Sequence, residues 1–145
     1  DFLNGKGYKV VLVDQFTQFG SNNCMNIAPK NIINKSNLKL SDVTSVINKA
    51  EFHIGISSGL SWLAWAVNTP VVLVSSFTKP YCEFTTNCIR IYNDTPTSGY
   101  FNTHRLDPLD WNWYPFKDLK NMEDWYEVEN ITPEQVINKI KTIIK

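Results

Sequence analysis

The sequence is poor in cysteine, in net charge and in long apolar runs. Its three cysteines, Cys24, Cys82 and Cys88, are odd in number and lack metal-ligand spacing, so they read as reduced thiols of a cytoplasmic protein. The 14 basic residues balance the 14 acidic ones, which argues against a surface for nucleic acid or for anionic membranes. The apolar stretch 59–74 is interrupted by polar residues and by Pro70, so no transmembrane segment is expected.

The chain does have enough apolar side chains for one folded domain. Its 145 residues are 43% hydrophobic and 19% charged, which predicts a single globular domain over 1–145 with a real core. The chain starts with Asp1 rather than Met, which favours a domain excised from a longer protein whose N-terminal partner domain is missing.

Short apolar segments alternate with amphipathic ones along the chain. Strands are expected at 8–14, 31–34, 52–56, 71–75 and 88–92, and helices at 41–50, 58–68 and 133–144, after a helix tail at 1–7. This alternation predicts an α/β fold: a doubly wound, Rossmann-like parallel sheet, formed by four or five of these strands, with helices on both faces. Thr132, Pro133 and Gln135 nearly form a capping box at the start of the last helix. Segment 93–130 is aromatic and aperiodic, and predicts an irregular excursion held by aromatic packing.

The Gly/Ser turn from Gly55 to Ser61 is the most informative segment, because it lies between two apolar strands and opens a helix. Backbone N–H groups at a helix start lack partners and favour an anion, typically a phosphate. Gly55 and Gly59 would let a ligand approach the backbone, and Ser57, Ser58 and Ser61 add hydroxyl donors. A tight turn with a Ser N-cap and no ligand explains the same residues about equally well.

Outside this turn, no residue pattern indicates catalysis. The sequence contains no Ser-His-Asp arrangement, no zinc spacing and no Asp-x-Asp motif, so no catalytic residue and no cofactor is assigned. His53 lies in an apolar strand and is expected to be a packed histidine rather than a base. Trp62 and Trp65 are expected in the core or in interdomain packing.

The segment Ser-Ser-Gly-Leu-Ser-Trp-Leu-Ala-Trp-Ala at 57–66, followed by Thr-Pro-Val-Val-Leu-Val-Ser at 69–75, resembles the C-terminal half of heptosyltransferase-like glycosyltransferases. The resemblance is greatest to the autotransporter O-heptosyltransferases, since 76–84 also matches their Pro…Glu-Phe element, and it runs from about Tyr8 to the C-terminus. It implies a bacterial enzyme of GT-B architecture, with two Rossmann-like domains facing across a cleft.

The resemblance also implies a site for a nucleotide-diphosphate sugar, expected to be an ADP-sugar, at the carboxyl ends of the strands. The serine turn would bind the pyrophosphate, Lys79 would neutralise a phosphate, and Glu83 would accept from ribose or sugar hydroxyls. If neither residue binds a ligand, Lys79 would be a solvated loop lysine and Glu83 a surface carboxylate. Gln15 and Phe16 would border the base. The implied donor-binding residues are Ser57, Ser58, Gly59, Leu60, Ser61, Thr78, Lys79 and Glu83.

The autotransporter group binds iron through four cysteines in an irregular finger, and this chain departs from that pattern. The four ligand positions would fall at Thr97, Tyr100, Tyr114 and Val128, none of which can make a thiolate site. We therefore expect segment 93–130 to be a metal-free version of the finger.

Three functions remain open from the sequence. The first is the donor-binding domain of a glycosyltransferase that acts on a protein or glycan acceptor, with its catalytic base in the missing domain and the isolated domain inactive. The alternative is a degenerate, non-catalytic donor domain that serves as a scaffold or partner-binding module. A nucleotide-sugar epimerase of the same architecture is the third.

Overall fold

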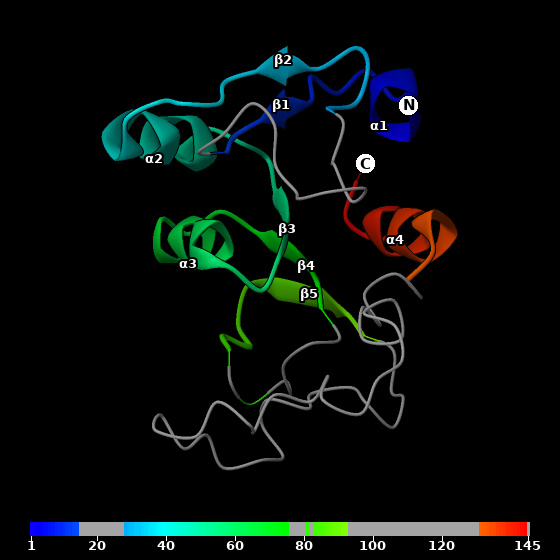
Figure 1. The fold of residues 1–145 in the computed structure, drawn as a ribbon. Helices are drawn as coiled ribbons and strands as arrows, with labels where there is room; N and C mark the ends of the chain where they lie inside the picture. The colour runs from blue at the N-terminus through cyan, green and yellow to red at the C-terminus, as the bar shows by residue number, and fades with distance from the viewer. Residues whose placement is uncertain (15–27, 76–80, 82, 93–130, 145) are drawn as a thin grey trace, which may run out of the picture. The chain divides into compact units, whose positions relative to one another are not determined.

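The computed structural model describes residues 1–14, 28–75, 81, 83–92 and 131–144 (Figure 1). The chain divides into two compact units, Asp1–Val46 and Ile47–Lys145. In the described part, no helix is long and apolar enough to cross a membrane.

The first unit contains a short two-stranded parallel sheet. It comprises α1 (Phe2–Gly5), β1 (Val11–Leu12), β2 (Ile33–Asn34) and most of α2 (Leu40–Asn48). After α1 the chain turns at Gly7, whose φ of +85° is a left-handed conformation that glycine adopts without steric cost. The Asn4 side chain donates a 2.9 Å hydrogen bond to the carbonyl of Asn31, which ties α1 to the segment before β2.

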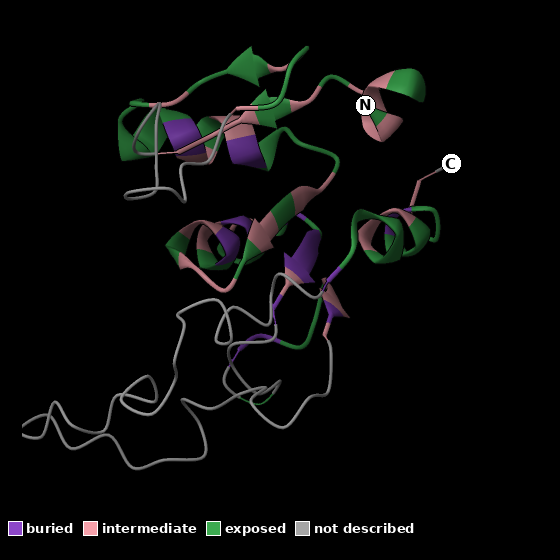
Figure 2. Ribbon diagram, turned by 45° about the vertical axis from the view of Figure 1, so that its right-hand side comes forward, coloured by how far each residue is buried: buried purple, intermediate pink, exposed green. Residues whose placement is uncertain are grey.

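The second unit is a three-stranded parallel sheet with helices beside it. It contains β3 (His53–Ile56), α3 (Gly59–Ala66), β4 (Val71–Val74), β5 (Cys88–Ile91) and α4 (Pro133–Ile140), in the strand order β3-β4-β5. Val71, Val72 and Leu73 of the central strand are at most 1% exposed (Figure 2), as expected for a parallel strand covered on both faces. α3 contacts β3 and β4, α4 contacts β5, and the sheet lies between the two helices in both views.

The start of α4 forms the capping box that its sequence predicts. The Thr132 hydroxyl accepts the backbone N–H of Gln135 at 3.3 Å, and the Gln135 side chain accepts the backbone N–H of Thr132 at 2.7 Å. Pro133 occupies the first turn, where its missing N–H costs no hydrogen bond. Ile140 at the other end is buried, so the cap and the apolar face together fix this helix.

The α/β class and the parallel strands are confirmed, but the expectation of one sheet is wrong for the described residues. β1 pairs with β2, and the Ile33 N–H of β2 donates a 2.9 Å bond to the carbonyl of Val10, just before β1. These two strands form a sheet distinct from β3-β4-β5. The helix expected at 41–50 spans Leu40–Asn48, so Ser41 lies within its first turn. The predicted excursion at 93–130 lies outside the described residues.

Candidate functional site

The candidate site lies at the carboxyl edge of the β3-β4-β5 sheet. The three strands are parallel, so their carboxyl ends meet at one edge, where ligands bind in open α/β sheets. Ser57 follows β3, Ser75 follows β4, and Arg90 projects from β5. These side chains come from three strands that are far apart in sequence, and the topology alone brings them to one edge.

The turn after β3 presents unsatisfied backbone donors. Ser58 is the N-cap of α3, but its side chain makes no capping hydrogen bond. Its carbonyl accepts the N–H groups of Ser61 and Trp62 at 3.1 and 3.2 Å. The N–H groups of Gly59 and Leu60 have no acceptor among the described residues. Two donors therefore stand at the positive end of the α3 dipole, where an anion is stabilised.

The two glycines of the turn have different roles. A Cβ built on Gly59 would meet no atom within 4 Å, so the space beside the N-terminus of α3 is open. Gly59 does not have a positive φ, so its backbone conformation does not itself require glycine. A Cβ on Gly55 would lie 2.5 Å from Ser61 Oγ and 2.6 Å from His53 Nε2. Protein atoms rather than a ligand therefore occupy the space beside Gly55, which corrects its expected role.

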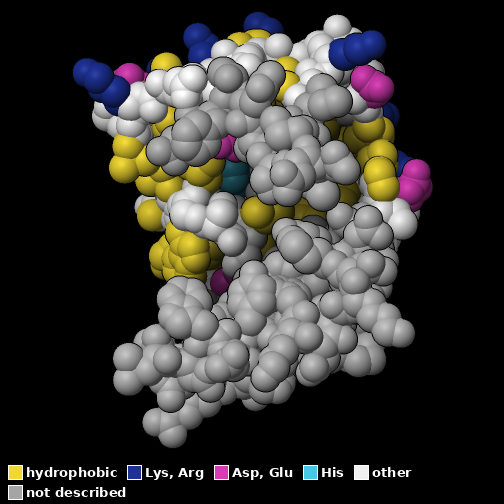
Figure 3. All heavy atoms as spheres, viewed as in Figure 1, with side chains coloured by type: hydrophobic (Ala, Val, Ile, Leu, Met, Phe, Trp, Pro, Cys, Tyr) yellow, Lys and Arg dark blue, Asp and Glu magenta, His cyan; other side chains and the backbone are white. Residues whose placement is uncertain are grey.

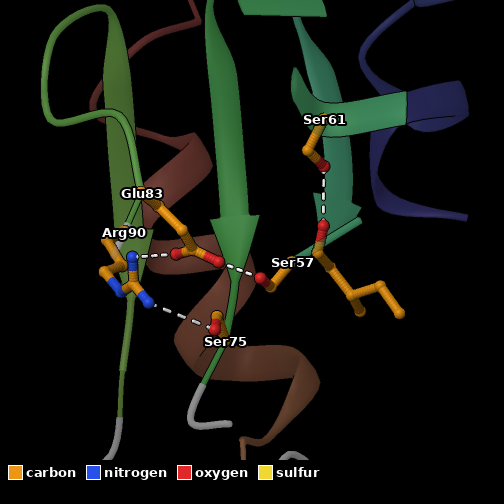
Figure 4. Close-up of polar contacts among 6 residues, drawn as sticks. Ser57, Ser61, Ser75, Glu83 and Arg90 are labelled. Atoms are coloured by element: carbon orange, nitrogen blue, oxygen red, sulfur yellow. Dashed lines mark hydrogen bonds and ion pairs between the residues drawn. The ribbon is translucent and has the colours of Figure 1, made fainter. Parts of the chain in front are cut away.

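Ser61 is a packing residue of α3 in this structure. It is fully buried, and its hydroxyl donates a 2.7 Å hydrogen bond to the Ile56 carbonyl at the end of β3 (Figure 4). The expectation that this hydroxyl faces a phosphate finds no support in the geometry, because its single hydrogen is used inside the protein. The bond instead fixes how α3 leaves β3, and so where the N–H groups of Gly59 and Leu60 point.

A partly buried polar network joins the three strand ends. The Ser57 hydroxyl donates to one carboxylate oxygen of Glu83, and the Arg90 guanidinium forms an ion pair with the other (Figure 4). Arg90 also donates to Ser75 Oγ at 3.2 Å. The Glu83 side chain is only 3% exposed, so reading it as a surface carboxylate is wrong. A carboxylate at this depth requires such pairing, because burying it alone would be costly.

Sequence reasoning alone does not find Arg90. A lone charged residue in the apolar strand Cys88–Ile91 is the available signal, since a buried arginine in a strand requires an acceptor nearby. Ser75 is missed for a related reason: a small polar residue after a strand indicates only where that strand ends.

Three aromatic rings fix the segment that carries Glu83. Phe84 is buried; its ring stacks on Trp65 at 5.6 Å and meets Trp62 edge-on at 5.1 Å between centroids. Trp65 Nε1 also donates to Thr86 Oγ1 at 3.3 Å. Trp62 and Trp65 are themselves 42% and 37% exposed, and hydrophobic side chains over α3 reach the surface (Figure 3). Neither tryptophan therefore lies in the core of the described part of the chain, and interdomain packing, the other role expected for them, stays a prediction.

His53 is half-buried at the start of β3, and burial lowers its pKa below the usual value of 6.5. Its Nε2 is buried without a hydrogen-bond partner among the described residues. A neutral imidazole held by packing fits the prediction made for it. Burial likewise raises the pKa of the Cys88 thiol, which disfavours a reactive thiolate.

Other predicted site residues lie outside the described residues. These include Thr78 and Lys79 of the implied donor site, and Gln15 and Phe16 beside the expected base. The structure therefore brings together Ser57, Ser58, Gly59, Leu60 and Glu83 from the predicted set and adds Arg90 and Ser75.

Comparison with known proteins decides the family. Residues 2–103 match the family model described as glycosyltransferase family 9 (heptosyltransferase). The chain belongs to this family. It is 33% identical over 146 residues to the autotransporter heptosyltransferase Aah of Escherichia coli, covering 98% of this chain and 37% of that protein. It is 35% identical to the autotransporter heptosyltransferase TibC of Escherichia coli O78:H11, covering 95% and 35% respectively.

Two further comparisons bear on activity and fold. The inactive autotransporter heptosyltransferase BimC of Burkholderia thailandensis is 35% identical over 101 residues, or 70% of this chain and 24% of that protein. The crystal structure of dodecameric, iron-containing TibC in complex with ADP-D-beta-D-heptose superposes with a TM-score of 0.80 at 31% identity, over 97% of this chain and 37% of that chain. Both the fold and the family resemblance are thereby confirmed, while the chain spans about a third of the length of the curated relatives it matches.

The iron named in that TibC structure raises the question of a metal site in this chain. Within the described ranges, no group of three or more His, Cys, Asp or Glu side chains is placed to hold a metal ion. The four positions implied as ligands, Thr97, Tyr100, Tyr114 and Val128, lie outside those ranges and offer hydroxyls and an aliphatic group in place of thiolates. These side chains therefore do not fit an iron site of the thiolate type.

Proposed function

We propose that the chain is a single-domain, C-terminal donor-binding half of a GT-B glycosyltransferase and that it binds an ADP-sugar. The observation that carries the proposal is the pair of N–H groups at Gly59 and Leu60, which lack acceptors among the described residues and border open space. The TibC structure, which holds ADP-D-beta-D-heptose and shares this fold, supports a nucleotide-sugar ligand.

In this proposal the diphosphate lies at the N-terminus of α3. The N–H groups of Gly59 and Leu60 donate to its oxygens, and the helix dipole favours its charge. The Ser58 hydroxyl, which does not cap the helix, adds a donor. Thr78 and Lys79 follow β4 in sequence and would complete the phosphate site, with Lys79 acting as a point charge.

The chemical step is assigned to no residue of this chain. Among the described residues, Glu83 at the sheet edge is paired with Arg90 and Ser57, and the buried His53 Nε2 has no hydrogen-bond partner. We therefore propose that the catalytic base and the acceptor site belong to an N-terminal domain, and that the donor-binding half alone transfers no sugar. A protein or a glycan is the proposed acceptor, and the cytoplasm is the proposed compartment.

A non-catalytic scaffold is the second candidate. The match to BimC, which is described as inactive, favours it, because a chain of this family can retain its sequence likeness without activity. An epimerase of similar architecture has no observation in its favour.

Calorimetric titration with ADP, UDP, GDP, CDP and an ADP-sugar tests the proposal. The wild type is expected to bind ADP and the ADP-sugar. Gly59→Val is expected to weaken that binding at least tenfold, about 1.4 kcal/mol, because the side chain fills the open space beside the donors. Lys79→Ala is expected to cost less, on the order of 1 kcal/mol. Gly5→Val, at another glycine with no atom near its Cβ position, is the matched control.

Two results would contradict the donor-binding function and favour the non-catalytic scaffold. One is the absence of binding by every nucleoside diphosphate at millimolar concentration. The other is binding that a folded Gly59→Val variant leaves unchanged. Sugar transfer to an acceptor by the intact protein that carries this chain would separate a transferase from an epimerase.

A further inference from the structure

The imidazole of His53 lies between β3 and the first turn of α3. His53 and Gly55 are two residues apart on β3, so their side-chain positions lie on the same face of the sheet. α3 packs on this face, since Ser61 Oγ lies 2.5 Å from where a Gly55 Cβ would stand. His53 Nε2 lies 2.6 Å from that same point. Ser61 and the imidazole therefore share the space that Gly55 leaves next to the start of α3.

The Nε2 atom of His53 is buried and has no hydrogen-bond partner in the part of the chain that the structure describes. A neutral imidazole has a hydrogen on one nitrogen only, whereas an imidazolium has one on each and a charge that burial penalises. Ser61 Oγ gives its hydrogen to the Ile56 carbonyl at 2.7 Å, and its lone pairs can accept. A proton on Nε2 would thus have an acceptor close by.

The described elements around the ring offer it no negative charge. α3 and β4, which pack on β3, contain no charged or titratable side chain. Glu51, two residues before His53, is exposed to solvent, and Glu83 forms its ion pair with Arg90. Burial accordingly lowers the pKa of His53. The positive end of the α3 dipole also disfavours a cation here.

A bound diphosphate would supply the negative charge. In the proposed site it lies at the N–H groups of Gly59 and Leu60, which belong to the same helical turn as Ser61. One turn of helix and the reach of the ring put the diphosphate on the order of 10 Å from the imidazole. Over that distance opposite unit charges change an equilibrium constant by about two- to tenfold in a partly solvated setting.

We propose that His53 couples donor binding to protonation, so that a proton on its imidazole and a diphosphate at the start of α3 stabilise each other. The inference rests on the proposed ADP-sugar site. By linkage, the ligand draws a proton from solvent onto His53 as it binds, and the affinity for the ligand rises as the pH falls. The donor is then held most tightly under mildly acidic conditions.

Calorimetric titration of the intact protein that carries this chain with ADP-heptose tests the coupling. The pyrophosphate of this ligand is a diester that keeps both negative charges between pH 5.5 and pH 7.5, so a change in affinity reports on the protein. The wild type is expected to bind about two- to tenfold more tightly at pH 5.5 than at pH 7.5. At pH 6 the binding enthalpy is expected to differ between MES and Bis-Tris buffers in the direction of proton uptake.

Two variants remove the titrating group in different ways. His53→Phe keeps a ring in the buried space, and His53→Gln keeps a polar side chain. Both are expected to lose the tighter binding at low pH and the proton uptake. His104→Gln removes the other histidine of the sequence and is expected to retain both. A purely structural role for His53 would change the affinity alike at every pH and would leave the number of protons unchanged.

The outcomes separate the two proposals. A wild type that binds no ADP-heptose at either pH overturns the donor site itself. A wild type that binds equally at both pH values, or folded His53 variants that keep the wild-type proton uptake, overturns only the coupling. Circular dichroism and melting temperature at each pH establish folding. If neither variant folds, the pH dependence and proton uptake of the wild type decide.

Discussion

The two glycines of the serine turn allow the same substitution to be tested in opposite surroundings. Gly55 and Gly59 are four residues apart, and the sequence alone predicts that both face a ligand. The structure instead places Ser61 Oγ and His53 Nε2 within 2.6 Å of where a Gly55 Cβ would stand, and no atom within 4 Å of a Gly59 Cβ. Gly55→Ala should therefore destabilise the protein, and Gly59→Ala should not.

The expected magnitudes follow from these contacts. Moving Ser61 Oγ away from the Gly55 Cβ would break its 2.7 Å bond to the Ile56 carbonyl at the end of β3, a loss of about 1 kcal/mol. Displacing the half-buried His53 ring adds to this, so Gly55→Ala is expected to lower the free energy of unfolding by about 2 kcal/mol, within the usual range for overpacking. Gly59→Ala is expected to raise it by about 0.5 kcal/mol, because alanine restricts the unfolded chain and suits a first helical turn.

Urea unfolding at pH 7.5 measures both variants, together with Ser61→Ala and the double variant Gly55→Ala/Ser61→Ala. In the Ser61→Ala background the atom that obstructs the new Cβ is absent, so Gly55→Ala should cost about 1 kcal/mol less than it does alone. If Gly55→Ala proved as harmless as Gly59→Ala, the close packing of β3 against α3 would be refuted.

Three further predictions concern charge and metal. Burial lowers the pKa of His53, so the unfolded chain protonates first as the pH falls; the free energy of unfolding should decline below pH 6.5, by at most about 1.4 kcal/mol per pH unit. His53→Gln should flatten this decline in pH-dependent melting, while His104→Gln, at the other histidine of the sequence, should not. Arg90→Leu should destabilise by about 3 kcal/mol in urea, since it removes the cation that neutralises the buried Glu83 carboxylate; a loss below 1 kcal/mol would contradict the importance of this ion pair. Elemental analysis should find no stoichiometric iron or zinc, and a tightly bound metal would contradict the finger alignment.

Local sequence signals predicted the secondary structure well. The apolar run Val71–Val74 predicted a strand, and the structure has this strand at the centre of the β3-β4-β5 sheet. Thr132 and Gln135 predicted the start of α4 because a capping box involves only residues three apart. Signals of this kind depend on neighbours along the chain, which a single sequence displays directly.

The side-chain pairing at the site could not be predicted in the same way. Glu83 precedes β5 and forms its ion pair with Arg90 near the carboxyl end of that strand. No local sequence pattern around either residue indicates that the two side chains meet. The role of Gly55 likewise depends on Ser61 from the following helix and on the His53 ring. Partition of the strands into two sheets depends on hydrogen bonds between segments more than 20 residues apart, such as Val11 with Ile33. Tertiary contacts decide each of these features.

Backbone amide NMR during an ADP titration tests the central claim most directly. The account predicts that the Gly59 and Leu60 N–H resonances shift most and saturate together, because these two donors at the N-terminus of α3 receive the diphosphate. Pyrophosphate alone should shift the same two resonances in the same direction. Saturable ADP binding that leaves both resonances unmoved, or no saturation at millimolar ADP, would contradict a phosphate site at this turn.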